Sequence, residues 1–247
     1  MTTPSPDPAG SDLTVVLVHG AFADSSGWSG VITELRAAGV PVVAVPNPLR
    51  GVSHDAAYVA SAMSQVPGRV LAVGHSYGGA VITNAALAAG NVVGLVYVAA
   101  FAPDEGETLQ DIEADSRDSV LTSALQQHTY PDGDGGTQVE LSIAPERFHD
   151  AFAADLSEEQ ARVMAATQRP ASALGFGEPT SAPAWKDLPS WAVIPTGDKA
   201  AGSDVLRTMA ARAGATVTEA EGSHVIMISQ PQVVTEVIRQ ALQAVSA

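Results

Sequence analysis

A serine flanked by two glycines is the strongest chemical signal in the sequence. The pentapeptide Gly-His-Ser-Tyr-Gly at 74–78 directly follows the apolar run RVLAV at 69–73 and precedes a helix-forming stretch at 80–89. A serine on a sharp strand-to-helix turn has strained backbone geometry, and the turn closes only if the residues two before and two after it are very small. We therefore predict that Ser76 is a nucleophile. A phosphate-binding loop fits poorly, because Ala80 stands where that loop requires Lys.

A serine hydroxyl needs a base to accept its proton, and the chain has six histidines. His224 comes just after the last predicted strand at 215–220 and ahead of the final helix, where a loop can reach back over Ser76. We expect His224 to be this base. For the other histidines no spacing predicts a metal site. We expect His19 to be buried and hydrogen-bonded to backbone, and we expect structural or surface roles for His54, His75, His128 and His149.

The base in turn needs a carboxylate that orients it. In α/β folds that hold a nucleophilic serine on such a strand-to-helix turn, the acid lies between the serine and the histidine in chain order, which restricts the search. Asp198 follows the predicted strand 191–196 directly, at the edge where the other reactive groups are expected. Asp104 follows the preceding strand and is the second candidate, whereas Asp187 and Asp204 have weaker positions.

Backbone N–H groups at two turns could stabilise a developing oxyanion. The Tyr77 N–H lies at a helix N-terminus, where an unpaired donor and the helix dipole favour negative charge. A second donor is expected after the first strand, in His-Gly-Ala-Phe at 19–22. There we expect the Ala21 N–H first and the Phe22 N–H second.

Apolar runs alternate with helix-forming stretches along most of the chain. Continuous apolar runs predict strands that are buried on both faces, at 13–18, 42–45, 69–74, 92–100, 191–196 and 215–220. Helix signals lie between them. One helix is expected to begin with a cap at Ser25 or Ser26 and to stop before Gly39, a second to begin with a cap at Ser203 and to end at Gly214, and the last to begin at Pro231. This alternation predicts an α/β fold with a doubly wound, mainly parallel sheet.

The alternation stops between about residues 104 and 189. Strand signals are weak there, and the Pro- and Gly-rich stretches 131–136 and 178–183 interrupt amphipathic pieces such as 157–167. A segment of this length is too long for an ordinary loop, so we interpret it as a lid over the carboxyl ends of the strands. Residues 13–247 are expected to form one domain, preceded by a disordered tail at 1–12.

Composition excludes several functional classes. The chain has 247 residues, of which 46% are hydrophobic, and a formal net charge of −15, so nucleic acid and anionic membrane surfaces are unfavourable partners. It contains no cysteine, which excludes thiolate nucleophiles and Cys-based metal sites. No secretion signal or membrane span is apparent, so we expect a cytoplasmic protein. The oligomeric state stays open, with a homodimer as one option.

With these residues assembled, the chain resembles the α/β-hydrolase superfamily from about Leu13 to Val245. The resemblance is closest to the compact-lid group of plant methyl esterases, hydroxynitrile lyases and small bacterial esterases. It depends on HGAF, GHSYGG, the Pro-Asp pair after VYVAAF, GDK and GSH occurring in the family's order. The resemblance implies a triad of Ser76, Asp198 and His224 and an acyl-enzyme mechanism.

Three positions depart from the patterns of related subgroups. Similar epoxide hydrolases and haloalkane dehalogenases have Asp at the position of Ser76, so an alkyl-enzyme ester is not expected. Hydroxynitrile lyases of the compact-lid group have a lysine at the position of Val225 and a threonine at that of Gly20, which argues against cyanohydrin cleavage.

These observations together predict a serine hydrolase that cleaves an ester or lactone of a neutral, apolar small molecule without cofactor or metal. Relatives with the same triad catalyse cofactor-independent oxygenation, perhydrolysis or carbon–carbon bond hydrolysis, and these are the alternatives. A ligand-binding receptor is a weaker one, because all three triad positions are filled. Aromatic side chains that could line the substrate pocket, or equally belong to the core, are Phe22, Tyr77, Phe101 and Trp185, together with Phe148, Phe152 and Phe176.

Overall fold

The computed structural model describes residues 12–133 and 135–246, and its centre is a parallel sheet. The sheet has six strands in the order β2-β1-β3-β4-β8-β9, and each neighbouring pair is parallel. This confirms the predicted fold class, and the apolar runs form the expected strands. Burial on both faces is wrong for the two edge strands, because Val43 in β2 and Val217 in β9 are exposed. The strands are β1 (Leu13–Val18), β2 (Val42–Val45), β3 (Arg69–His75), β4 (Val92–Val98), β8 (Ser190–Pro195) and β9 (Thr216–Ala220).

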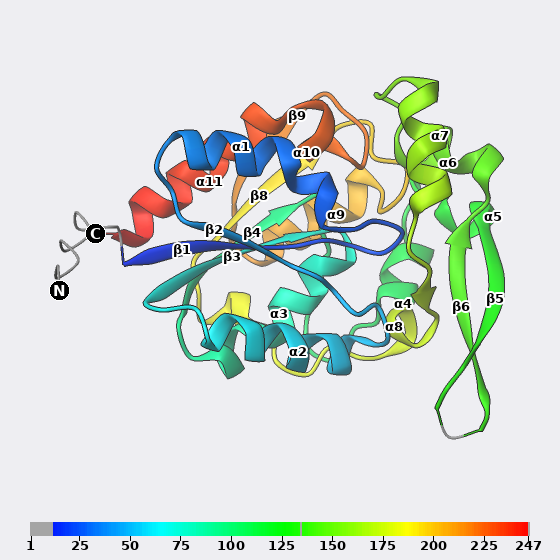
Figure 1. Cartoon of the computed structure of the whole chain (residues 1–247), viewed down its shortest axis with the longest axis horizontal. Coiled ribbons are helices and arrows are strands. Elements are labelled where there is room, and N and C mark those ends of the chain that lie inside the picture. The colour runs from blue at the N-terminus through cyan, green and yellow to red at the C-terminus, as the bar shows by residue number, and fades with distance from the viewer. Residues whose placement is uncertain (1–11, 134, 247) are drawn as a thin grey trace, which may run out of the picture.

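Helices cover both faces of this sheet (Figure 1). Helices α1 and α11 lie on one face, and α2 and α3 lie on the other. In α11 the buried side chains Val234, Val237, Ile238 and Ala241 recur at helical spacing, so one stripe faces the core. The elements are η1 (Ser25–Trp28), α1 (Ser29–Ala37), α2 (Val52–Ser64), α3 (Tyr77–Ala89), α9 (Ser203–Arg212), α10 (Ile226–Ser229) and α11 (Pro231–Ser246).

Two helix starts differ from the prediction. The first helix is capped by Asp24, whose extended backbone lets its side chain accept a hydrogen bond from Ser26 N at 2.7 Å, and its first turn is the 3₁₀ helix η1. Ser203 is the first residue of α9 and does not cap it. Its hydroxyl instead donates to Pro195 O at 2.6 Å and accepts from Asp198 N at 3.1 Å.

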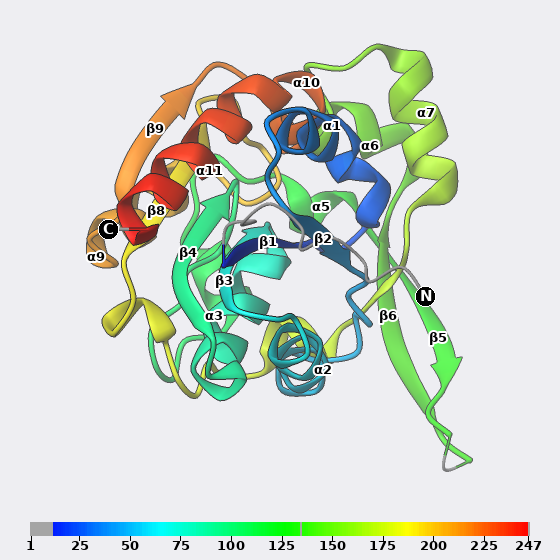
Figure 2. The ribbon, with the colours of Figure 1, turned by 60° about the vertical axis from the view of Figure 1, so that its left-hand side comes forward.

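The insertion between β4 and β8 contains a β-hairpin that the sequence does not predict. Its strands are β5 (Leu125–Pro131), β6 (Thr137–Ile143) and β7 (Ala171–Ser172), which form an antiparallel sheet. Its helices are α4 (Leu109–Ala114), α5 (Leu121–Ala124), α6 (Pro145–Phe152), α7 (Glu158–Thr167), α8 (Leu174–Gly177) and η2 (Ala184–Lys186). Figures 1 and 2 show the hairpin, α6 and α7 beyond the ends of the central strands.

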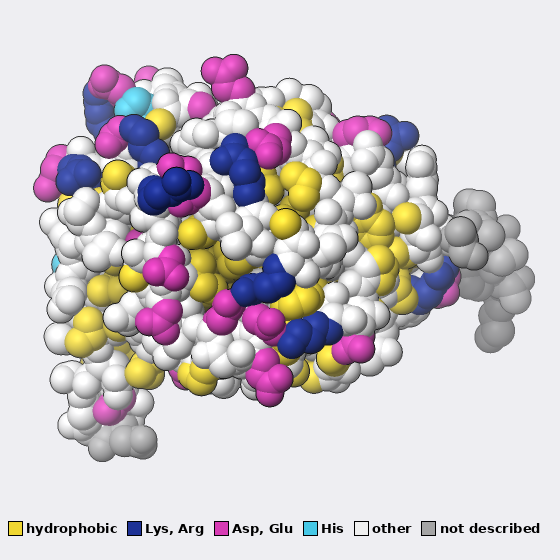
Figure 3. Space-filling model, turned by 180° about the vertical axis from the view of Figure 1, so that it is seen from behind, with side chains coloured by type: hydrophobic (Ala, Val, Ile, Leu, Met, Phe, Trp, Pro, Cys, Tyr) yellow, Lys and Arg dark blue, Asp and Glu magenta, His cyan; other side chains and the backbone are white. Residues whose placement is uncertain are grey.

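The periphery shows charge of both signs. On the face seen in Figure 3, acidic and basic side chains are interspersed. Ion pairs between them include Arg207 with Glu219 and Arg212 with Glu107.

Within the described ranges, no helix is both long enough and apolar enough to span a bilayer. Of the expected tail at 1–12, residues 1–11 lie outside the described residues, whereas Asp12 O accepts a hydrogen bond from Arg69 N at 2.7 Å.

The turn between β3 and α3 has no space for a side chain at its glycines. A Cβ at Gly74 would lie 2.5 Å from Gly78 O, and a Cβ at Gly78 would lie 2.5 Å from Val18 O. The clashing atoms belong to the backbone, which cannot rotate away as a side chain can. The tight packing of this turn therefore depends on both glycines, as the sequence pattern predicts.

We expect Gly78→Ala to lower the free energy of unfolding by at least about 2 kcal/mol, because the added methyl group overpacks a buried backbone contact. Chemical denaturation would measure this change. Gly177→Ala is the matched control, because a Cβ there approaches nothing closer than 4.0 Å. Equal stability of the two variants would contradict the steric explanation.

Candidate active site

Ser76 occupies the turn between β3 and α3 in a strained conformation. Its backbone has φ 53° and ψ −125°, which is unusual for a residue other than glycine. Its N–H donates to Val98 O at 3.3 Å, and its carbonyl accepts from Gly79 N at 2.9 Å and Phe101 N at 3.2 Å. A Cβ at Gly20 would lie 2.6 Å from Ser76 Cβ, so the loop after β1 packs directly against the serine.

His224 and Asp198 form a buried pair at the same edge of the sheet. His224 Nδ1 lies 2.7 Å from Asp198 Oδ2, and both residues are 1% exposed. Asp198 Oδ1 accepts hydrogen bonds from Ala200 N and Ala201 N, each at 2.9 Å. The loop therefore fixes the carboxylate, and the carboxylate holds the imidazole with its proton on Nδ1 and its lone pair on Nε2.

Ser76 Oγ and His224 Nε2 form no hydrogen bond with each other or with any other described residue. Such contacts are often long in unliganded enzymes and shorten only in the complex with substrate.

The other carboxylates considered as partners of His224 have other contacts. Asp104 pairs with Lys186 Nζ at 2.6 Å, and this hydrogen bond lowers the pKa of Asp104. Asp204 accepts from Ser116 Oγ at 2.7 Å and from Arg117 N at 2.8 Å. Asp187 is at the C-terminal end of η2. Of the four candidates, Asp198 alone contacts His224 among the described residues.

Two further histidines support the loops around Ser76. His75 is fully buried, its ring centroid is 4.8 Å from that of His224, and its Nε2 donates to His224 O at 2.9 Å. Burial lowers the pKa of His75, and the neighbouring His224 lowers it further. His19 is buried as expected; its Nδ1 donates to Gly20 O and its Nε2 accepts from Asn47 N, both at 2.9 Å.

The remaining histidines lie outside this cluster. His54 contacts Asp55 at 3.2 Å, His128 contacts Ser142 Oγ at 3.0 Å, and His149 contacts Leu156 O at 2.9 Å. In the part of the chain that the structure describes, no group of three or more His, Cys, Asp or Glu side chains could hold a metal ion.

The predicted oxyanion donors are unpaired N–H groups. In the described residues, no backbone hydrogen bond is donated by Ala21, Phe22 or Tyr77. Phe22 adopts φ 60°, a second strained position beside Ser76. Buried N–H groups without a partner are uncommon, so these donors are available to a ligand.

Four aromatic rings lie around the loop at 19–22 and His224. The Phe22 ring is stacked with Phe176, with a centroid distance of 6.2 Å, and is edge-on to Phe152, with a centroid distance of 6.3 Å. The Phe152 ring centroid is 4.9 Å from that of His224. Tyr77 lies 5.9 Å from Phe176, but its hydroxyl donates to the buried Asp55 at 2.9 Å. Burial and Asp55 together raise the pKa of Tyr77.

The other predicted substrate-binding residues lie outside this group of rings. The Trp185 indole donates to Pro103 O at 2.9 Å, and the Arg212 guanidinium lies 5.8 Å from its ring. Phe101 is buried, and its backbone N–H contacts Ser76 O.

Asp155, which the sequence analysis does not single out, connects the insertion to the histidine loop. Its carboxylate accepts from Ser223 N at 2.9 Å and from Ser229 Oγ at 2.6 Å, and it also contacts Ser223 Oγ. Because Ser223 precedes His224 directly, this contact fixes the backbone on one side of the imidazole. Neither its position nor its neighbours in sequence indicate this contact, which forms only in the folded chain.

We expect His75 to make the protein less stable in acid. Its pKa in the folded state is well below the ordinary value of 6.5, so below that pH only the unfolded chain takes up its proton. The free energy of unfolding should therefore fall as the pH drops from about 7 to about 5, by up to about 1 kcal/mol per pH unit for this group. His75→Gln, which can keep the donor, should make this slope shallower in denaturation curves, whereas the exposed-residue control His128→Gln should not. An unchanged slope in His75→Gln would argue against a neutral buried His75.

Comparison with known proteins agrees with this fold. Residues 15–237 match the model of the alpha/beta hydrolase family. No curated protein sequence matches the chain significantly. Similar solved structures are polyneuridine aldehyde esterase, 21% identical with TM-score 0.76 over 92% of this chain and 98% of that one, and a methylesterase from Arabidopsis, 19% identical with TM-score 0.76 over 94% and 99%. A pyrethroid hydrolase from Sphingobium faniae JZ-2 is 21% identical, with TM-score 0.73 over 92% and 96%. The family match and the shared fold show that this chain belongs to the α/β-hydrolase family.

Proposed function

We propose that this protein is a serine hydrolase that cleaves a carboxylic ester or lactone of a neutral, apolar small molecule. The observation on which this depends most is the buried pair of His224 and Asp198, 2.7 Å apart, at the sheet edge that also holds Ser76. Ser76 in strained geometry, beside unpaired N–H groups, adds a nucleophile and an oxyanion site.

The reaction begins when Ser76 Oγ attacks the carbonyl carbon while His224 Nε2 accepts the hydroxyl proton. The carbonyl oxygen becomes an oxyanion, which accepts hydrogen bonds from the Ala21 and Tyr77 N–H groups, with Phe22 as the alternative donor. The bond from carbon to the leaving oxygen then breaks, and His224 returns the proton to that oxygen. Water, activated by His224, attacks the acyl-enzyme and releases the acid and free Ser76.

The surroundings favour neutral, apolar substrates. Phe22, Phe152 and Phe176 lie around the reactive residues. Lys199, the only basic residue beside Asp198 in sequence, pairs with Asp150 at 2.6 Å. The names of the similar structures, two esterases and a pyrethroid hydrolase, agree with an ester substrate. We assign the insertion the role of a lid, because its hairpin, α6 and α7 lie beyond the ends of the central strands. Ser76 and His224 follow the ends of two of these strands, β3 and β9.

We expect the wild type to hydrolyse p-nitrophenyl acetate, butyrate and octanoate, and Ser76→Ala to lose at least about 10³-fold in kcat/KM on each. Release of p-nitrophenolate measures both, and a thermal unfolding curve of the variant controls for folding. Folded wild type that hydrolyses none of these esters would overturn the esterase assignment in favour of oxygenation, perhydrolysis or carbon–carbon bond cleavage.

Asp198→Asn tests the orienting carboxylate. The amide cannot stabilise the imidazolium and favours the wrong tautomer, so kcat should fall by about 10⁴-fold. Asp104→Asn is the control, since Asp104 follows a neighbouring strand but pairs with Lys186. The assignment would be wrong if Asp104→Asn caused the larger loss.

A further inference from the structure

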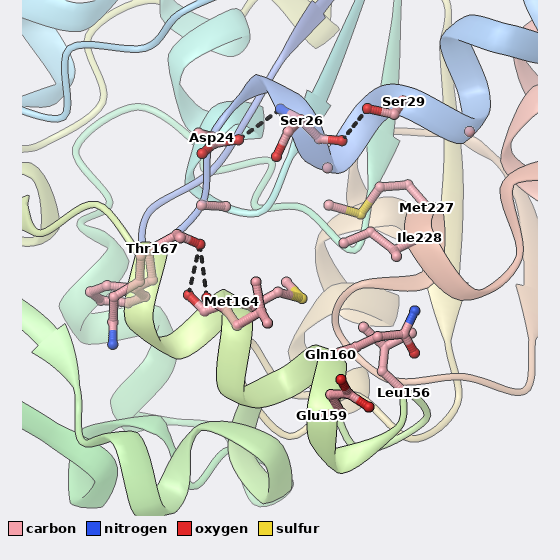
Figure 4. Close-up of a pocket in the computed structure, with 16 residues that line it drawn as sticks. Asp24, Ser26, Ser29, Leu156, Glu159, Gln160, Met164, Thr167, Met227 and Ile228 are labelled. Carbon is pink, nitrogen blue, oxygen red and sulfur yellow. Dashed lines mark hydrogen bonds between the residues drawn. The ribbon is translucent and has the colours of Figure 1, made fainter.

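A groove opens at the surface beside helix α7 (Figure 4). Its volume is about 410 Å³, within the range of pockets that hold small organic molecules. Three segments line it: α7, the loop and helix start at 22–30, and α10. We call it the α7 groove.

Helix α7 contributes a complete face to the α7 groove. Gln160, Val163, Met164 and Thr167 line it at the i, i+3, i+4, i+7 spacing of one helix face. The buried residues Ala161 and Ala165 lie on a different face of the same helix. Val163 is 59% exposed, an unusually high value for an apolar residue. Among the described residues, therefore, Val163 on this face is left largely uncovered, whereas Met164 packs partly against the core.

The other walls continue directly from the reactive loops. Phe22 lines the groove and is the residue after Ala21, whose N–H is a proposed oxyanion donor. Met227 and Ile228 line the opposite side and follow His224 by three and four residues. Two walls of the groove thus continue in sequence from the segments that hold the proposed oxyanion donors and the proposed base.

Some polar groups that line the groove are already hydrogen-bonded within its walls. Ser29 Oγ donates to Ser26 O at 2.7 Å, Asp24 accepts from Ser26 N at 2.7 Å, and Thr167 Oγ1 donates to Val163 O at 3.0 Å. None of the lining side chains is Lys or Arg, whereas Asp24 and Glu159 are acidic. These features disfavour an anion and leave apolar surface as the main means of binding.

Aromatic rings separate the groove from the reactive atoms. Ser76 is 6% exposed and His224 is 1% exposed, so a substrate cannot reach them without movement of side chains. Phe22, itself 1% exposed, lies between the groove and Phe152, whose ring contacts His224. Rotation of the Phe22 side chain would connect the groove to the oxyanion loop.

We propose that the α7 groove binds the apolar acyl arm of the ester substrate. This inference rests on the proposed function. The leaving oxygen must face His224, beside which the Phe152 ring already lies, and the oxyanion must face the Ala21 and Tyr77 amides. The acyl arm is the remaining substituent of the reacting carbon, and the route past Phe22 ends in the groove. Helix α7 then determines which acyl lengths are accepted.

The test narrows the groove with Val163→Trp and compares p-nitrophenyl octanoate with p-nitrophenyl acetate. The octanoate-to-acetate ratio of kcat/KM should fall at least about tenfold, because several methylene groups lose their apolar contact. Arg162→Trp is the matched control: its side chain is on the same helix, is 74% exposed and does not line the groove, so the ratio should stay unchanged.

A second series, ethyl, butyl and octyl acetate, varies only the alcohol. Val163→Trp should leave the dependence on alcohol length within about twofold of wild type, because the acyl group is constant. If Val163→Trp changed the dependence on alcohol length but not the octanoate-to-acetate ratio, the groove would not bind the acyl arm. An unchanged octanoate-to-acetate ratio in Val163→Trp would overturn the groove proposal while ester hydrolysis itself still stood.

Direct binding separates failure of the groove from failure of the proposed function. In Ser76→Ala, calorimetry should show p-nitrophenyl octanoate binding at least about tenfold more tightly than the acetate, and Val163→Trp added to this variant should abolish the difference. If the octanoate binds more tightly than the acetate but wild type hydrolyses neither ester, the groove proposal stands and the esterase assignment is rejected. Equal affinity for both esters would reject the groove.

Discussion

The positive φ of Ser76 is the constraint on which the site depends. Such a conformation costs about 1–3 kcal/mol in a residue with a side chain, and it persists only where the surrounding structure prevents relaxation. Here Val98, Gly79 and Phe101 hold the backbone of Ser76 on both sides. The side chains of β3 from Val70 to Val73 are fully buried, so hydrophobic burial stabilises the turn against its strain.

The parts of the site that the sequence could predict are those with local signals. The five residues around Ser76 contain the small residues that the tight turn requires, so this turn is predictable. The strands are predictable because they are continuous apolar runs. The serine–acid–histidine chain order and the meeting of parallel strand ends at one edge reduce the candidate acids to four and place Asp198 ahead of Asp104. The side-chain contacts themselves, of Asp198 with His224 and of Asp104 with Lys186, are visible only in the folded chain.

What the sequence could not predict depends on contacts between distant residues or on exposed strands. Strand β5 is mostly exposed, so Gln126 and Gln127 show none of the hydrophobic alternation that identifies a half-buried strand. Asp155 and Asp55 hold Ser223 and Tyr77, but each pair is far apart in sequence and has no spacing pattern. The cap is Asp24 rather than Ser25 or Ser26 because the backbone is extended at Asp24, and several residue types at that point would allow this conformation.

The insertion leaves the sheet after β4 and rejoins it at β8, and these strands are hydrogen-bonded neighbours. The six-stranded sheet therefore contains no strand of the insertion. The entropy of closing a loop grows only with the logarithm of its length, about 0.6 kcal/mol for each doubling. Insertions of different length and architecture can therefore replace this one at little thermodynamic expense. Exchange of this segment would leave the central sheet intact, but it would also remove the Asp155 contacts that hold Ser223 beside His224.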